Sequence, residues 1–147
     1  MKILKTSHYD ALNMKPYQTK YLSSAKVIQK ALKNDRCMGF YAIENNTRIS
    51  FALVKKFDED SYFLWNFLID SKYQGLGKGK KFLQLLVDEL QKSYSTKVIT
   101  TTYIYGNEVS KNFFKSFGFA ETDVVCEDDV HEVNMELIIK KRGVGRL

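Results

Sequence analysis

The sequence predicts one α/β domain over residues 1–147, with a mixed β-sheet flanked by helices. Three observations support this prediction. Two apolar runs around an Asn-Asn pair indicate an antiparallel hairpin near the start, and strand-like and helix-like segments alternate in the middle of the chain. A chain of 147 residues with 44% hydrophobic and 14% aromatic residues also has the size of one domain and enough apolar material for one core.

The first expected elements are a short strand, a helix and the hairpin. "MKILK" (residues 1–5) is the strand. The runs "MGFYAIE" (38–44) and "RISFALVKK" (48–56) flank the Asn-Asn turn of the hairpin. Between the first strand and the hairpin, a helix is expected over about residues 19–33 because apolar residues recur there at helical spacing. These residues are Leu22, Ala25, Val27, Ile28, Ala31 and Leu32.

The central elements are two strands with a helix between them. "SYFLWNFLI" (61–69) is apolar on both faces, which is typical of a strand buried in mid-sheet. "KVITTTYIY" (97–105) is rich in β-branched and aromatic residues, which favours a second strand. The helix is expected from Lys78 to about Lys92, with an inward apolar stripe. That stripe consists of Phe82, Leu83, Leu86, Val87 and Leu90.

The last elements are a helix and two strands. Asn107 has N-cap chemistry, Glu108 favours a first turn, and Gly118 ends the helix. Its inward residues are expected to be Val109, Phe113 and Phe117. The strands "FAETDVVC" (119–126) and "HEVNMELIIK" (131–140) follow around an "EDD" loop, and residues 141–147 form a basic tail.

The composition excludes several classes of protein. No segment approaches the roughly 20 apolar residues of a membrane span, and the first residues contain no signal-peptide run. Cys37 and Cys126 lie outside any CxxC or Cys/His cluster, so we expect no metal site and two buried, reduced thiols. This pattern predicts a cytoplasmic protein.

The charge is positive overall but unevenly distributed. A net charge of +6 suits an anionic partner, either nucleic acid or a phosphorylated cofactor. Residues 121–136 nevertheless hold seven carboxylates and no Lys or Arg, and the chain has no nucleic-acid-binding signature, so we expect no nucleic-acid partner. The carboxylates either attract a polycationic amine or form a solvated strand face.

The turn between residues 70 and 80 predicts an anion site. Gly75, Gly77 and Gly79 allow the backbone to curl around phosphate oxygens, and Lys78 and Lys80 add positive charge before a helix N-terminus. The turn does not fit a P-loop, because no Ser or Thr follows the lysines, and it does not fit the dinucleotide motif GxGxxG. The alternative is a glycine turn before a solvated, lysine-rich helix.

The pattern that does fit is Q-x-x-G-x-G at residues 74–79. It resembles the acyl-CoA pyrophosphate loop of the GNAT N-acetyltransferase superfamily. "GNEVSKNFFKSFGF" (106–119) is similar to a second element of that family, N-x-x-A-x-x-x-Y-x-x-x-G-F. "WNFLIDSKYQGLGKGKKFL" (65–83) looks most like the bacterial spermine/spermidine acetyltransferases.

The resemblance implies a splayed sheet of the GNAT type that binds acetyl-CoA as co-substrate, between residues 61–69 and 97–105. The pantetheine arm would pair with the backbone of Phe67, Leu68 and Ile69. Asn107, whose other role is the N-cap, would contact the same arm, and Phe114 would lie beside it. The amides expected at the pyrophosphate belong to Gln74, Gly75, Leu76, Gly77, Lys78, Gly79 and Lys80.

The resemblance also implies direct acyl transfer, with a backbone N–H near Leu68 stabilising the oxyanion. The family's usual thiolate protonator is a Tyr, but Phe114 occupies that position. Either water protonates the thiolate, or Tyr105 or Tyr103 substitutes, with Tyr105 as our first choice, or the domain binds CoA with slow turnover. Candidates for the base, none of them assigned, are Asp70, Glu108 and His131.

The function expected from these observations is N-acetylation of a primary amine on a small cationic acceptor, such as a polyamine. The alternatives are a protein or aminoglycoside N-acetyltransferase and a weakly catalytic acyl-CoA sensor. We expect no membrane partner, and a homodimer is left open.

Overall fold

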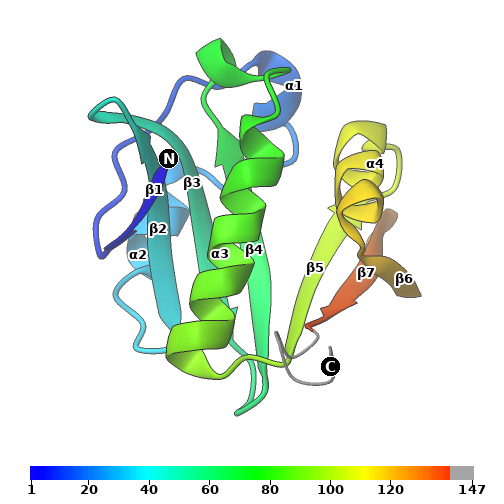
Figure 1. The fold of residues 1–147 in the computed structure, drawn as a ribbon. Helices are drawn as coiled ribbons and strands as arrows, with labels where there is room; N and C mark the ends of the chain where they lie inside the picture. Colours follow the sequence, from blue (N-terminus) through cyan, green and yellow to red (C-terminus); the bar gives the residue numbers. More distant parts are fainter. Residues whose placement is uncertain (140–147) are drawn as a thin grey trace.

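The computed structural model describes residues 1–139, and it confirms the predicted mixed sheet flanked by helices (Figure 1). The predicted basic tail at 141–147 lies outside these residues. The strands are β1 (Lys2–Thr6), β2 (Cys37–Glu44), β3 (Thr47–Lys56), β4 (Ser61–Ile69), β5 (Val98–Ile104), β6 (Ala120–Glu127) and β7 (Val130–Ile138). The helices are α1 (Pro16–Thr19), α2 (Ala25–Ala31), α3 (Lys78–Tyr94) and α4 (Glu108–Phe117), with a 3₁₀ turn at Ser71–Tyr73.

The seven strands form one sheet in the order β1-β2-β3-β4-β5-β7-β6. Neighbouring strands are antiparallel except β4 and β5, which are parallel and joined through α3. Asn45 and Asn46 make the β2–β3 turn with φ of 52° and 60°, a left-handed geometry that Asn tolerates and that matches the twist of a hairpin. The order of elements therefore follows the predicted one.

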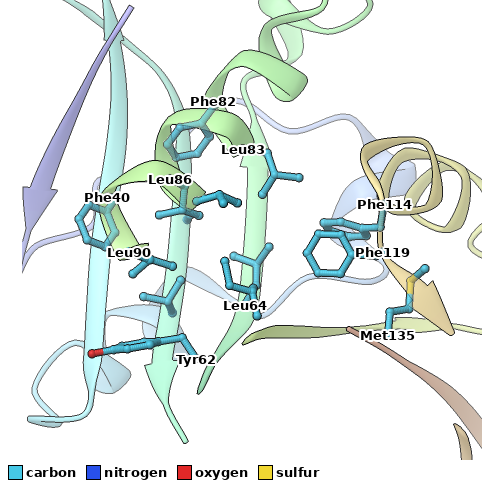
Figure 2. Close-up of a cluster of buried hydrophobic side chains, with 14 of the residues drawn as sticks. Phe40, Tyr62, Leu64, Phe82, Leu83, Leu86, Leu90, Phe114, Phe119 and Met135 are labelled. Carbon is cyan, nitrogen blue, oxygen red and sulfur yellow. The ribbon is translucent and has the colours of Figure 1, made fainter. Parts of the chain in front are cut away.

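Two apolar clusters cover the two faces of the sheet. On one face, the buried stripe of α3 packs on β2, β3 and β4, and Phe114 of α4 packs with Phe119 and Met135 on the other half (Figure 2). On the opposite face, Ile28 and Leu32 at α2 pack against Phe51 and other residues of the first strands. We call these the α3/α4 face and the α2 face.

The parallel pair β4–β5 is joined only along its N-terminal half. The paired residues run from Ser61 opposite Val98 to Leu64 opposite Thr101, where the Thr101 hydroxyl donates to the Leu64 carbonyl at 2.9 Å. Beyond this point the two strands separate (Figure 1). The rest of β4 is therefore bordered by a strand only on its β3 side.

Trp65 is an extra residue in β4 at the point of separation. Leu53 of β3 lies opposite Asn66 and the next residue, Val54, lies opposite Leu64, so Trp65 forms a β-bulge. After the bulge, Asn66 bonds to Ser23 on the α2 face, with Nδ2 donating to Oγ at 3.1 Å. Phe67 points the other way and stacks on Phe82 of α3.

Three predicted details of local structure are wrong. The helix expected over 19–33 begins only at Ala25, because Ser24 accepts from the Val27 N–H at 3.2 Å and caps it. In α4 Phe113 and Phe117 pack against the core as expected, but the buried residue is Phe114, and Val109 is exposed. Cys126 is exposed on β6, while Cys37 is buried as expected.

Within residues 1–139, none of the helices combines the length and the apolar character that crossing a bilayer requires.

Replacing Leu86 by Ala is expected to lower the free energy of unfolding by about 2–5 kcal/mol, because this side chain is fully buried between α3 and the sheet. Leu85→Ala is the matched control on the same helix, where the side chain is only half-buried and the loss is expected to be smaller. Urea denaturation of both variants measures the difference. Equal losses would contradict the observed orientation of α3.

Candidate active site

A cavity of about 580 Å³ lies where β4 and β5 separate, and it is lined from both faces of the sheet. Phe113 and Phe114 of α4 belong to the α3/α4 face. Leu22 and Ser23, which precede α2, belong to the opposite face. The cavity is therefore a passage through the sheet, and two molecules can approach its centre from opposite sides.

The peptide groups of β4 beyond the bulge point alternately toward β3 and toward the cavity. The Asp70 N–H donates to the Ile49 carbonyl of β3 at 2.9 Å, whereas the Ile69 carbonyl accepts from Gln74 Nε2 at 2.9 Å. Because the alternation continues along the strand, Phe67 and Ile69 turn their peptide groups toward the cavity and Leu68 turns its own toward β3. Phe67 and Ile69 also line the cavity, and Leu68 is absent from the lining.

The glycine-rich loop brings bare backbone to the end of this cavity. Gly75 and Gly77 have φ near +75°, and a Cβ on either would meet no atom within 4 Å, so a side chain here is limited by backbone strain rather than by space. Gly77 is the N-cap of α3 and provides no side chain to bond the first-turn N–H groups. Every loop residue from 74 to 80 lines the cavity except Leu76, which is exposed.

The lysines of the loop differ in their partners. Lys78 Nζ forms an ion pair with Glu44 at the end of β2, and this hydrogen bond lowers the pKa of the Glu44 carboxyl. Lys80 lines the cavity and makes no ion pair with any described residue. Lys80 is therefore the loop lysine whose charge is available to an anion in the cavity.

The N-terminal segment holds the loop in place. Gln74 Nε2 donates to Gln18 Oε1 of α1 as well as to the Ile69 carbonyl. Asp70 is buried, and its two carboxylate oxygens accept the backbone N–H groups of Lys72 and Asn13 at 3.0 and 3.2 Å. Asp70 is thus occupied as a turn carboxylate, which leaves it little freedom to accept a proton from a substrate.

Asn107 lies at the cavity and caps α4. Its Oδ1 accepts the Ser110 N–H at 3.3 Å, and its Nδ2 donates to the Ser110 hydroxyl. Asn107, Ser110 and Phe114 all line the cavity. The predicted contact with a pantetheine arm stays a prediction, and the cap that the sequence predicted is present.

Neither tyrosine proposed as a proton donor is free inside the cavity. Tyr103 is buried, and its hydroxyl donates to Glu121 Oε1 at 2.7 Å. Burial, followed by this hydrogen bond, raises the pKa of Tyr103 to about 12, and the same bond lowers the pKa of Glu121. Tyr105 is 74% exposed next to His131 and is absent from the cavity lining.

The remaining base candidates also lie outside the cavity lining. Glu108 pairs with Lys111 on the surface of α4, and His131 is exposed. The carboxylate that does line the cavity is Glu132, on β7 opposite Ile104. Sequence reasoning included it only as part of an acidic stretch. The alternation of Glu132 and Asn134 with the apolar Val133 and Met135 was the signal that could have separated it.

Comparison with known proteins gives one family and several relatives. The sequence profile of the "Acetyltransferase (GNAT) family" matches residues 2–119. A spermine/spermidine N(1)-acetyltransferase of Bacillus subtilis (strain 168) is 30% identical over 118 residues, which are 74% of this chain and 76% of that protein.

Solved structures share the fold at lower identity. A GNAT family acetyltransferase from Elizabethkingia anophelis, with acetyl-CoA bound, superposes with a TM-score of 0.71 at 16% identity, over 93% of this chain and 98% of that one. The ribosomal-protein-S18-alanine N-acetyltransferase from Escherichia coli gives a TM-score of 0.70 at 18% identity, over 99% of each chain. At this level of identity, the two superpositions show that the fold is shared.

Gly77→Ala is expected to weaken coenzyme A binding about tenfold, because a left-handed backbone costs a residue with a Cβ roughly 1–2 kcal/mol and the loop would relax out of its curled form. Gly118→Ala is the control, since Gly118 also has positive φ (129°) but ends α4 away from the cavity. Calorimetric titration of both folded variants with coenzyme A measures the effect. Equal affinities for the two variants would show that the loop amides do not hold the ligand.

Proposed function

Because the chain belongs to the GNAT acetyltransferase family, we propose that it transfers an acetyl group from acetyl-CoA to a primary amine of a small cationic acceptor, such as a polyamine. The family match covers residues 2–119, and the chain is an acyltransferase with acetyl-CoA as co-substrate. The observation that carries the proposal is the cavity through the splayed sheet, which a donor and an acceptor can enter from opposite faces.

The donor would enter from the α3/α4 face. Its diphosphate suits the uncapped N–H groups at the start of α3, with Lys80 adding charge. Its pantetheine arm has amide groups that match the outward peptide groups of Phe67 and the outward N–H of Ile69, whose carbonyl already accepts from Gln74. Phe113 and Phe114 give the arm an apolar wall. The cavity lining thus offers the three features that such a donor requires: anion binding, backbone pairing and apolar contact.

The chemistry is direct transfer. The neutral amine attacks the thioester carbon, a C–N bond forms, the C–S bond breaks, and coenzyme A leaves as a thiolate. The tetrahedral oxyanion needs an N–H donor pointing into the cavity. The direction of the peptide groups favours Phe67 or Ile69 for this role over Leu68, the residue first expected.

Water is the proton donor that best suits the thiolate here. Phe114 has no proton to give, and Tyr105 is exposed outside the cavity lining. Tyr103 lines the cavity, but its hydroxyl already donates its proton to Glu121 Oε1 at 2.7 Å and is therefore not directed at a thiolate. A weakly catalytic acyl-CoA sensor therefore stays the second candidate.

The acceptor class is supported by charge and by relatives. Asp123 and Glu132 line cavities that reach the α2 face, and a cationic amine would be drawn there. The Bacillus subtilis relative is named for spermine and spermidine. The Escherichia coli neighbour, named for a protein alanine, has the same fold, so the fold does not choose between these acceptors.

The proposal is tested by measuring thiol release from acetyl-CoA against a panel of polyamines, aminoglycosides and a peptide with a free α-amine. We expect the highest kcat/KM with a polyamine. Coenzyme A binding without thiol release for any amine would favour the sensor. Preference for the peptide or an aminoglycoside would keep the acyltransferase and overturn the polyamine.

Phe114→Tyr is expected to preserve or raise kcat, by up to about 10²-fold, because it restores a phenol at the wall of the cavity. Phe119→Tyr is the matched control, since its ring lies 5.3 Å from that of Phe114 but outside the cavity lining. Steady-state kinetics with the best amine of the panel decides. A large fall in kcat for Phe114→Tyr alone would mean that Phe114 shapes the site for a different chemistry.

A further inference from the structure

We propose that Glu132 is the acceptor-binding carboxylate of this enzyme, which holds the acceptor's ammonium beside Trp65 and takes the proton that the ammonium must lose. This inference rests on the proposed function. It assigns a role to a residue that lies far from the cofactor loop in the sequence.

The position of Glu132 follows from the sheet. Its neighbours Val133 and Met135 are buried in the cluster of the α3/α4 face, so alternation along β7 turns Glu132 and Asn134 to the α2 face. Ile104 of β5 lies opposite Glu132. Glu132 thus stands on the β5 side of the passage, on the face opposite to the α3 N-terminus.

Glu132 is the sole carboxylate lining this cavity within residues 1–139. Over the same residues it makes no ion pair and no side-chain hydrogen bond. Nearby carboxylates differ in this respect. Glu121 accepts from Tyr103 and pairs with Lys115 at 3.4 Å, and Glu108 pairs with Lys111 at 3.9 Å. A charge that faces a cavity and lacks an internal partner is suited to a cationic ligand.

A second cavity, of about 590 Å³, gives the rest of the acceptor a place on the α2 face. It shares Trp65, Thr101 and Thr102 with the first cavity and continues to Asn134 and Asp123. Trp65 therefore borders both spaces, and an indole that lines the same cavity as a carboxylate suits an alkylammonium group by cation–π attraction.

The charges of the second cavity favour one direction for the acceptor. Arg36, Lys55 and Lys56 line it from the β2–β3 side, whereas Asp123 lines it from β6. β5 and β7 lie between β4 and β6 in the sheet. Further ammonium groups of a polyamine would therefore extend from Glu132 toward Asp123 and away from the basic end.

The proton balance of the reaction is complete with this assignment. The acceptor ammonium gives one proton to the Glu132 carboxylate, directly or through a water. The resulting amine forms the C–N bond, and the C–S electron pair leaves with the thiolate. The second amine proton reaches the thiolate through water, and Glu132 releases its own proton to solvent.

The test compares Glu132→Gln with Glu136→Gln and Glu132→Asp. Glu136 lies on the same strand and the same face but lines neither cavity, so it is a matched control. We expect kcat/KM for the best amine of the panel to fall by about 10²-fold or more in Glu132→Gln, to recover partly in Glu132→Asp, and to stay nearly unchanged in Glu136→Gln.

A binding measurement separates this proposal from the proposed function. Trp65 is the one tryptophan in the chain, and its fluorescence reports amine binding to the coenzyme A complex. The probe is the best amine of the panel, or spermidine if none reacts. We expect Glu132→Gln to weaken amine binding about tenfold while leaving coenzyme A affinity unchanged.

Each outcome decides the role of Glu132. Equal amine affinity and equal kcat/KM in wild type and Glu132→Gln would overturn it, as would a wild type that binds no amine. A wild type that binds the amine through Glu132 but releases no thiol would keep the acceptor site and overturn the proposed transfer.

Discussion

The end of the β4–β5 ladder is the constraint on which the rest of the site depends. Hydrogen bonding between the two strands stops at Leu64 and Thr101, where a side-chain hydroxyl takes the place of a further backbone donor. Beyond that point β4 keeps a strand partner on one side only, and its outward peptide groups face the cavity, where the Ile69 carbonyl accepts from the Gln74 side chain. An extended ligand with amides of its own can pair with the outward groups that remain, those of Phe67 and the Ile69 N–H.

This interruption also gives the two faces different roles. The α3/α4 face presents a helix N-terminus, glycines and aromatic rings, which suit an anionic, partly apolar donor. The α2 face presents Trp65 and Glu132, which suit a cation. The bulge at Trp65 connects the two, because it shifts the alternation of β4 so that Phe67 packs on α3 while Trp65 borders both cavities. The anionic donor and the cationic acceptor thus reach the thioester carbon from different faces of the sheet and do not compete for the same surface.

Much of the fold could be predicted because its signals are local. The Asn45-Asn46 turn, the apolar stripe of α3 and the caps of α4 each depend on neighbouring residues. The start of α2 was missed because Ser24, an ordinary cap, lies inside a run that already had helical spacing. The direction of the Leu68 peptide was missed because it depends on a bulge, which only the register with β3 defines. The alternation of Glu132 with Val133 gives only the face of the strand to which Glu132 points, and its place at the cavity depends on the pairing of β7 with β5.

The aromatic contacts across the separation have a consequence for stability. Phe67 of β4 stacks on Phe113 of α4, and a Cβ on Gly79 would lie only 3.2 Å from the Phe113 ring, so the two halves of the sheet touch again above their short ladder. A ligand that bonds to β4, α3 and α4 at once would bridge both halves and would bind only while they are assembled. The temperature of thermal unfolding is therefore expected to rise with the concentration of this ligand. A free ligand concentration of 100 times the dissociation constant would raise the free energy of unfolding by about 2.7 kcal/mol.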